Sequence, residues 1–184
     1  MMINFKSYPW KRTKMSPSFV GLEAVCNYIE GLGKESMLEI GAGASTWYLH
    51  QLGFKTYTAV ETFPAVVERF NSLNLKNFTL VQKWEDIPVL KYQWVFIDSH
   101  VGGNALGNQR EKPLIYAIEN KLLKDPVIIF FHDYRGIKLT NEGKNPHKWA
   151  RAHDGWNNTV RDYKLRLVET LNKDEFGVYK MGDK

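Results

Sequence analysis

Short apolar runs alternate with segments of helical periodicity along most of this chain, and that alternation restricts its fold more than any other feature. Runs typical of buried strands occupy 37–40, 57–60, 78–82, 94–98 and 127–134. Apolar residues at helical spacing occupy 16–32, 46–52, 66–73 and 111–123. Because parallel neighbouring strands need a helix-length crossover between them, this order predicts a mostly parallel sheet with helices packed on it.

The end of the chain breaks the alternation and predicts a hairpin. Two strand-like runs, "LRLVETL" and "FGVYKM", flank 172–174 with no room for a helix between them. We therefore predict an α/β fold: a doubly wound, mostly parallel seven-stranded sheet with one antiparallel strand from the C-terminal hairpin and helices on both faces. The 184 residues suit a single domain, 1–184, with a basic N-terminal extension at 1–15 and a polar insertion at 136–160.

Composition excludes several classes of protein. Cys26 is the only cysteine, so neither an intrachain disulfide nor a cysteine-rich zinc site is available, and we expect a cytoplasmic location. No apolar run approaches the roughly 20 residues that span a bilayer, and residues 1–14 lack the apolar centre of a signal peptide, so we expect no membrane partner. The net charge of +5 and the run KSYPWKRTK permit a nucleic-acid partner, although a solvated basic surface is the favoured interpretation.

A glycine-containing turn follows the first predicted strand, in "SMLEIGAGASTWYLHQLG" (36–53). Gly41 and Gly43 let the backbone approach a ligand, and Glu61 ends the next strand, where it can accept hydrogen bonds from two ribose hydroxyls. Glu39, just before the glycines, would repel the pyrophosphate of a dinucleotide but attract an ammonium group. The third glycine of the dinucleotide fingerprint is also missing. These features favour S-adenosylmethionine over NAD as the ligand.

Four motifs together resemble the class I S-adenosylmethionine-dependent methyltransferases: "LEIGAGAST", "AVE" ending at Glu61, "WVFIDSH" and "IIFFHDYRG", in the expected order over 16–134. The resemblance implies that Glu61 binds the ribose and that Lys83 and Trp84 lie near the adenine. Trp84 can equally be a core residue. The cofactor site implied by the resemblance comprises Glu39, Gly41, Ala42, Gly43, Ser45, Thr46, Glu61, Thr62, Lys83, Trp84 and Asp98.

Two further strand ends carry side chains suited to the chemistry at the methyl acceptor. Asp98-Ser-His100 and His132-Asp133-Tyr134 follow adjacent predicted strands. This arrangement resembles metal-dependent O-methyltransferases acting on catechols or sugar hydroxyls, which implies that Asp98 and Asp133 bind Mg²⁺ or Mn²⁺. General-base catalysis by His100 or His132 without a metal is the alternative. We predict methyl transfer to a hydroxyl of a small molecule or saccharide, with four catalytic residues: Asp98, His100, His132 and Asp133.

The acceptor contacts are less constrained. Arg110, Tyr134 and Arg135 are the candidate substrate residues, although each arginine can instead pair on the surface. The polar insertion, with Trp149 and Trp156, can close over an acceptor or fix a helix to the sheet. No Asn/Asp-Pro-Pro-aromatic sequence follows the fourth predicted strand, which counts against exocyclic-amine DNA methyltransferases. Methylation of nucleic acid or protein, and a non-catalytic cofactor-binding subunit, are the alternative functions.

Overall fold

The computed structural model describes residues 7–10, 16–98, 111–143 and 150–182. Within these residues one seven-stranded sheet has the strand order β3-β2-β1-β4-β5-β7-β6. The strands are β1 (Ser36–Ile40), β2 (Thr56–Val60), β3 (Phe78–Val81), β4 (Tyr92–Ile97), β5 (Leu123–His132), β6 (Arg166–Leu171) and β7 (Phe176–Met181). The helices are α1 (Phe19–Glu30), α2 (Ala44–His50), α3 (Pro64–Asn71), the 3₁₀ turn η1 (Trp84–Asp86), α4 (Lys112–Glu119), α5 (Tyr134–Asn141) and α6 (Ala150–Asp162).

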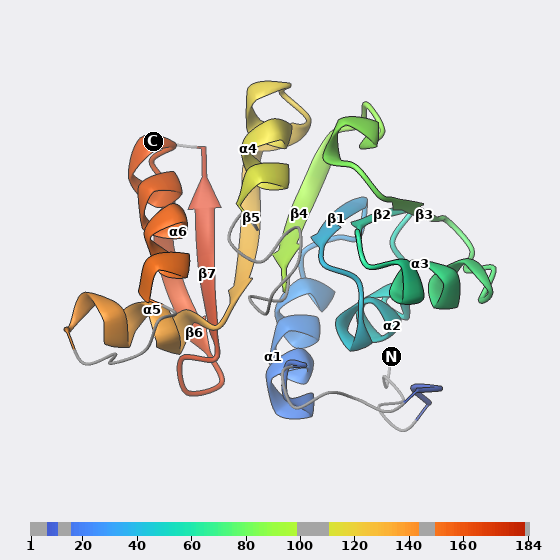
Figure 1. Ribbon diagram of the computed structural model, residues 1–184, viewed down its shortest axis with the longest axis horizontal. Helices are drawn as coiled ribbons and strands as arrows, with labels where there is room; N and C mark the ends of the chain where they lie inside the picture. Colours follow the sequence, from blue (N-terminus) through green and yellow to red (C-terminus); the bar gives the residue numbers. More distant parts are fainter. Residues whose placement is uncertain (1–6, 11–15, 99–110, 144–149, 183–184) are drawn as a thin grey trace.

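Strand directions confirm the predicted fold class. Strands β1 to β5 pair in parallel, whereas β7 is antiparallel to both of its neighbours, β5 and β6. Figure 1 shows β7 running opposite to β4 and lying between β5 and β6. The antiparallel strand is therefore the second from the edge of the sheet, and β6, the first strand of the hairpin, forms that edge.

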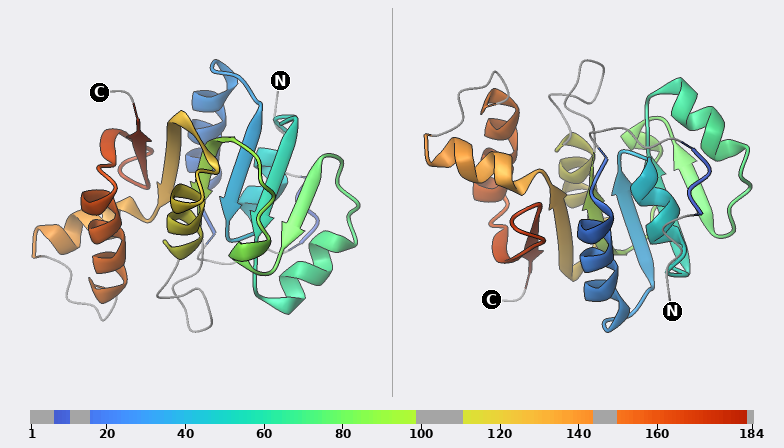
Figure 2. Two further views of the ribbon diagram at one scale, coloured as in Figure 1. Left: turned by 90° about the horizontal axis from the view of Figure 1, so that it is seen from above. Right: turned by 90° about the horizontal axis from the view of Figure 1, so that it is seen from below.

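Two apolar layers hold the helices against the sheet. Side chains of α1, α2 and α3 pack on one face, here called the α1 face, and those of α4, α5 and α6 pack on the other, the α4 face (Figure 2). Successive side chains of a strand point to opposite faces. On β4, Trp94 and Phe96 therefore belong to the α1 face, while Val95 and Ile97 belong to the α4 face.

The pairing register determines which polar residues meet at the carboxyl ends of the strands. Phe96 of β4 pairs with Phe130 of β5, and both belong to the α1 face. Asp98 and His132 each lie two residues further along, so the same alternation turns both toward the α1 face. Phe176, the first residue of β7, pairs with His132. The ends of β4 and β5 and the beginning of β7 thus meet at one place.

Several predicted boundaries differ from the observed ones by two to four residues, and two helix ends among them have a clear local cause. The sequence predicts that α1 begins at 16–17, but the helix begins at Phe19 and its N-cap is Ser18, whose Oγ accepts a backbone N–H of the first turn at 2.9 Å. The sequence also predicts that α4 extends to 123, but it ends at Glu119 because Lys121 adopts a left-handed conformation with φ of 55°. In both places a local backbone choice, and not the apolar pattern, sets the boundary.

The polar insertion contributes most of α5 and α6. Trp156 of α6 is fully buried, and its ring stacks on Phe131 of β5 with the centroids 4.1 Å apart. Of the two roles considered for this tryptophan, the structure shows the one that fixes a helix to the sheet. Trp149, the other tryptophan of the insertion, lies outside the described residues. In the part of the chain that the structure describes, no helix is both long enough and apolar enough to cross a membrane.

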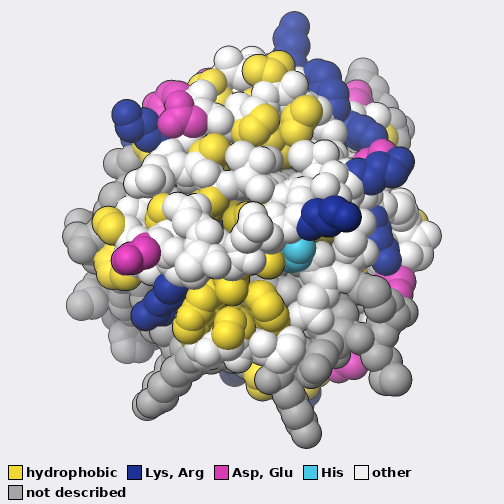
Figure 3. All heavy atoms as spheres, turned by 90° about the vertical axis from the view of Figure 1, so that its right-hand side faces the viewer, with side chains coloured by type: hydrophobic (Ala, Val, Ile, Leu, Met, Phe, Trp, Pro, Cys, Tyr) yellow, Lys and Arg dark blue, Asp and Glu magenta, His cyan; other side chains and the backbone are white. Residues whose placement is uncertain are grey.

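Of the basic N-terminal extension, the structure describes residues 7–10, and this short segment packs on the α1 face. Trp47 of α2 donates its indole N–H to Ser7 Oγ at 2.9 Å, and the Trp10 ring lies edge-on to Phe70 of α3 at 5.5 Å. Figure 3 shows the right-hand side of Figure 1, where the largest group of hydrophobic side chains lies in the lower middle of the view and most Lys and Arg side chains lie toward the upper right. The segment is therefore part of the packed fold between α2 and α3.

Candidate active site at the carboxyl edge of the sheet

The turn after β1 leaves its backbone open to a ligand. Gly41 has a φ of +94°, a conformation that favours glycine, and its N–H donates to Val60 O at 2.9 Å. A Cβ built on Gly43 would have no atom of the described residues within 4 Å apart from its chain neighbours, so these residues leave space open above it. The Gly43 N–H donates to Thr46 Oγ1 at 2.8 Å. The predicted turn is thus present, with free space at the second glycine.

Glu39 and Ser45 lie beneath this turn. Glu39 is fully buried, and its carboxyl group accepts hydrogen bonds from Ser45 Oγ at 2.7 Å and from the Tyr57 hydroxyl at 2.8 Å. Burial raises the pKa of Glu39 to about 8, against the opposing effect of these hydroxyl donors. The side chains of Ser45 and Thr46 are also buried. These three residues support the turn from within the protein, and direct contact with a cofactor stays a prediction for them.

Replacing Glu39 with glutamine should change how stability depends on pH. The folded-state pKa of about 8 exceeds the ordinary value of 4.5, so the folded protein holds a proton that the unfolded chain releases, and stability falls as pH rises from 4.5 to 8. One proton of difference changes the free energy of unfolding by about 1.4 kcal/mol per pH unit. From pH 6 to pH 7.5 the free energy of unfolding of wild type should therefore fall by roughly 2 kcal/mol more than that of Glu39→Gln.

Urea unfolding of both proteins at several pH values measures this difference, in which the titrations of all other groups cancel. Glu35→Gln is the matched control, since Glu35 precedes the same strand but is exposed and pairs with Lys55 at 2.8 Å. That variant should run parallel to wild type over this pH range. Parallel curves for Glu39→Gln as well would show that Glu39 is ionised in the folded protein at neutral pH.

Glu61 follows β2 and turns back to the glycine turn. Its Oε2 accepts the Ala42 N–H at 3.1 Å, and its Oε1 accepts the Phe63 N–H at 2.7 Å. Burial raises the pKa of Glu61, and the backbone N–H donors, including that of Thr62, oppose the shift. A carboxylate has about four lone-pair sites, so acceptor capacity remains for a ligand. Phe63, which the sequence did not point to, binds this carboxylate through its backbone N–H, and its side chain is exposed.

Lys83 and Trp84 occupy the next strand end, after β3. Lys83 is exposed and immediately precedes η1, in which Trp84 is the first residue. The Trp84 side chain is half-buried and packs against the apolar layer of the α4 face. The core role considered for Trp84 is therefore observed, and contact of either residue with an adenine stays a prediction.

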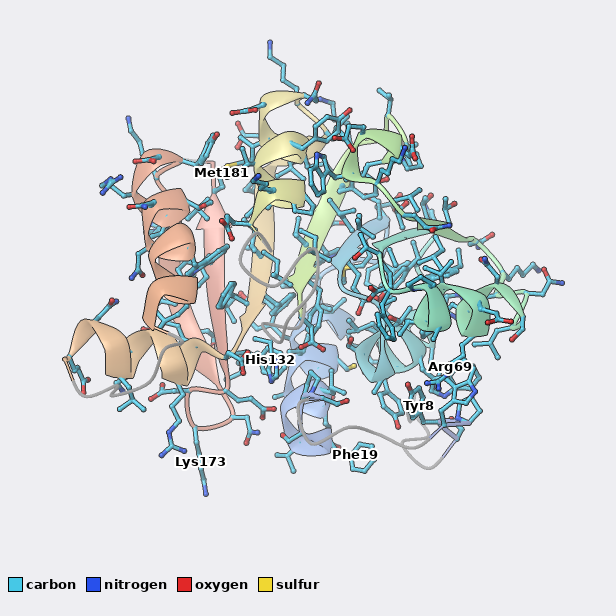
Figure 4. All side chains as sticks on the ribbon, viewed as in Figure 1. Tyr8, Phe19, Arg69, His132, Lys173 and Met181 are labelled. Carbon is cyan, nitrogen blue, oxygen red and sulfur yellow. The ribbon has the colours of Figure 1, made fainter. Side chains whose placement is uncertain are left out.

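Asp98 and His132 form an acid–imidazole pair at the ends of β4 and β5. His132 Nδ1 lies 2.7 Å from Asp98 Oδ1, and Ser45 Oγ lies 3.3 Å from Asp98 Oδ2. Figure 4 labels His132 in the lower half of the view, above Phe19, which lies at the start of α1. The sequence placed Asp98 and Asp133 together at this rim, but the close partner of Asp98 is His132. Asp133 has a φ of 69°, and its Oδ1 lies 3.7 Å from His132 Nδ1.

Both members of the pair have shifted pKa values. Burial raises the pKa of Asp98, and the neighbouring His132 opposes that shift. Burial lowers the pKa of His132, but Asp98, Glu175 and Asp133 together outweigh burial and raise it to about 10. The imidazole is therefore protonated at neutral pH in the free protein. Glu175, in the turn before β7, lies 3.6 Å from His132 Nε2 and is a site residue that the sequence analysis missed.

The remaining predicted site residues are placed as follows. Tyr134 begins α5 directly after Asp133, and its N–H donates to Glu175 O at 3.2 Å. Arg135 is exposed in the first turn of α5, where its charge, after the larger effects of Lys138, contributes to lowering the pKa of Asp174. His100 and Arg110 lie outside the described residues. Within the described part, no group of three or more His, Cys, Asp or Glu side chains is arranged to hold a metal ion, so the Mg²⁺ or Mn²⁺ site stays a prediction.

Comparison with known proteins supports the fold through structure and not through sequence. No protein-family model and no curated protein matches this chain. It is similar to the structure of an SAH-bound methyltransferase, PaMTH1 from Podospora anserina, with a TM-score of 0.69 at 14% identity, covering 97% of this chain and 84% of that one.

Two O-methyltransferases are similar in the same way. The O-methyltransferase from Bacillus cereus in complex with SAH has a TM-score of 0.65 at 13% identity, over 93% of this chain and 84% of that one. TomG from Streptomyces achromogenes, involved in tomaymycin synthesis and in complex with SAM, has a TM-score of 0.62 at 13% identity, over 97% and 94%. Together with the strand order, these likenesses show that the chain has the fold of the class I S-adenosylmethionine-dependent methyltransferases.

Proposed function

We propose that this protein is an S-adenosylmethionine-dependent methyltransferase that methylates a hydroxyl group of a small molecule or saccharide. The observation that carries the proposal is the juxtaposition at one edge of the sheet. The open glycine turn and Glu61 follow β1 and β2, and the Asp98–His132 pair follows β4 and β5. The cofactor and the group that accepts the proton of the hydroxyl would therefore lie side by side.

The residues at this edge fit S-adenosylmethionine, which supplies an electrophilic methyl group on a sulfonium. The free space at Gly43 admits a ligand against the backbone, and the remaining lone pairs of Glu61 can accept two ribose hydroxyls. Glu61 and Asp98 also bring carboxyl groups to a ligand that carries positive charge. The same carboxyl groups would repel a pyrophosphate, which distinguishes this ligand from a dinucleotide.

His132 is the group that we assign to proton removal from the acceptor hydroxyl. Asp98, bonded to Nδ1, fixes the ring, and Nε2, 3.6 Å from Glu175 Oε1, is the nitrogen that would take a proton in molecules whose imidazole is deprotonated. With S-adenosylmethionine bound to supply the methyl group, the proton of the acceptor hydroxyl would pass to this imidazole as the methyl group is transferred to the oxygen. Metal-assisted ionisation of the acceptor by Asp98 and Asp133 is the other route. Calorimetric titration of wild type and Asp133→Ala with Mn²⁺ tests that route.

Replacing Glu61 with alanine should weaken cofactor binding without unfolding the protein. Hydrogen bonds to a charged group contribute about 1.5–3 kcal/mol, so we expect the Kd for S-adenosylhomocysteine to rise about 10- to 100-fold. Calorimetry measures this directly. Glu68→Ala, on the exposed side of α3, is the matched control and should bind as wild type does. Equal affinity of the Glu61 variant and wild type would remove the ribose role.

The function itself is tested by product formation. We expect the isolated chain to convert S-adenosylmethionine to S-adenosylhomocysteine when it is supplied with phenolic, catechol or saccharide acceptors. Turnover only with nucleic acid or protein acceptors would contradict the assigned acceptor class. Tight cofactor binding with no turnover on any acceptor would favour the non-catalytic subunit.

A further inference from the structure

Glu175, in the turn between β6 and β7, is held in one orientation by three donors. Its Oε1 accepts a hydrogen bond from the Ser18 N–H at 2.6 Å, and its Oε2 accepts hydrogen bonds from the Ser18 hydroxyl at 2.5 Å and from the Asn172 side-chain amide. The Ser18 hydroxyl oxygen in turn accepts hydrogen bonds from the Asn172 side-chain amide and from the Gly21 N–H, both at 2.9 Å. This carboxylate therefore links the β6–β7 turn to the N-cap of α1.

The same carboxylate faces the candidate catalytic imidazole. Glu175 Oε1 lies 3.6 Å from His132 Nε2, while Asp98 binds the other ring nitrogen at 2.7 Å. The imidazole also packs on Phe176, with ring centroids 5.0 Å apart. The charged groups around His132 come from three elements: Asp98 after β4, Asp133 after β5, and Glu175 before β7.

Gly21 of α1 leaves the space that Glu175 occupies. A Cβ at Gly21 would come within 2.7 Å of both Glu175 Cδ and Phe176 Cε2, which is closer than such atoms approach. Alanine is otherwise favoured over glycine within a helix. Position 21 therefore has room for glycine but not for a larger residue while Glu175 lies beside it.

We propose that Glu175 is a positioning residue for His132: held by Ser18 and Asn172, it lies beside Nε2 and fixes the imidazole with Nδ1 on Asp98. The expected effect on kcat rests on the proposed function. The contact between Glu175 and the His132 ring does not depend on it. Glu175 acts on the ring by direct electrostatic contact, and α1 takes part in the site because its N-cap holds Glu175.

Four variants test the proposal in the full-length chain. Glu175→Ala removes the carboxylate, Glu175→Gln keeps its shape and one acceptor oxygen, and Gly21→Ala displaces the carboxylate from another element. Asp174→Asn is the matched control, because the adjacent Asp174 binds Lys138 at 2.8 Å and is not one of the carboxylates that face His132 in the described part of the chain. Because Glu175 also raises the pKa of His132, kcat is compared at its high-pH limit, where the imidazole is deprotonated in every variant. There we expect kcat to fall about 10- to 100-fold in Glu175→Ala and Gly21→Ala, because a catalytic group is misplaced. Glu175→Gln should recover part of this loss.

Two readouts separate positioning from a merely structural role. The Kd for S-adenosylhomocysteine should stay at its wild-type value in all four variants, so the loss falls on kcat. In protein labelled with ¹⁵N-histidine, the His132 ring signals, assigned with His132→Gln, should move in Glu175→Ala and Gly21→Ala but not in Asp174→Asn. This measurement needs no methyl acceptor, so it tests the contact even if the proposed function fails.

Unchanged ring signals in Glu175→Ala, or a loss of kcat in Asp174→Asn as large as in Glu175→Ala, would overturn the proposal. If Glu175→Ala does not fold, the comparison of Glu175→Gln and Gly21→Ala with Asp174→Asn decides the question. Wild-type ring signals and a wild-type kcat in both Glu175→Gln and Gly21→Ala would likewise overturn the proposal.

Discussion

Replacing His132 with glutamine is expected to lower kcat about 10²- to 10⁴-fold, the range that a positioned general base contributes. Glutamine fills similar space but cannot take the proton of the acceptor hydroxyl. The Kd for S-adenosylhomocysteine should hardly change, because the glycine turn and Glu61 lie on β1 and β2 and His132 lies on β5. Steady-state kinetics and calorimetry on one preparation measure both quantities. His50→Gln is the matched control, since His50 bonds to Lys76 O at 2.7 Å.

The pH dependence of the wild-type reaction follows from the environment of His132. Burial alone would lower the pKa of this imidazole, but the three carboxylates around it raise the pKa to about 10. A base that holds its proton until that pH is active only in its deprotonated fraction. We therefore expect kcat/KM to rise about tenfold per pH unit through the neutral range, as a single ionisation requires. A plateau reached near pH 7 would assign proton removal to another group or to a metal-bound acceptor.

The parts of the site that depend on local sequence could be predicted. Each polar group after an apolar run lies at a strand end, so the glycine turn, Glu61 and Asp98 fall where the sequence placed them. The partner of Asp98 was assigned less well. Proximity at the rim suggested Asp133, whereas the alternation of side chains along β4 and β5 puts Asp98 and His132 on the same face. Asp98 lies two residues after Phe96, and His132 lies two residues after Phe130. Because Phe96 and Phe130 pair on one face, this count identifies Asp98 and His132 as partners.

Glu175 could not be found from sequence alone because its role depends on a long-range pairing. In the sequence it ends a polar run, 172–175, that is typical of a solvated hairpin turn. It reaches His132 only because β7 inserts between β5 and β6 and pairs Phe176 with His132. The N-cap that holds Glu175 was also placed two residues early. A residue with partners 157 positions away leaves no local pattern.

Replacing Trp156 with alanine is expected to destabilise the protein by about 3–5 kcal/mol, the usual cost of removing a fully buried tryptophan. The indole is enclosed on the α4 face, stacked on Phe131 at 4.1 Å and edge-on to Tyr179 at 5.1 Å. A loss of this size is a large share of the roughly 5–15 kcal/mol that stabilises a typical domain. Urea unfolding measures it. Trp156→Phe should lose clearly less, because it keeps an aromatic ring against Phe131.

The same variant separates a core role from an acceptor lid. Trp156 lies on the α4 face of the sheet, whereas Asp98 and His132 turn toward the α1 face. Well below its melting temperature, Trp156→Ala should therefore keep the wild-type KM for the acceptor and the wild-type kcat per folded molecule. A lid tryptophan would give the opposite result, with normal stability and a raised KM. That outcome would contradict the observed packing of α6. It would show that Trp156 stabilises the bound acceptor and not the fold, and it would support the acceptor-lid role of the polar insertion.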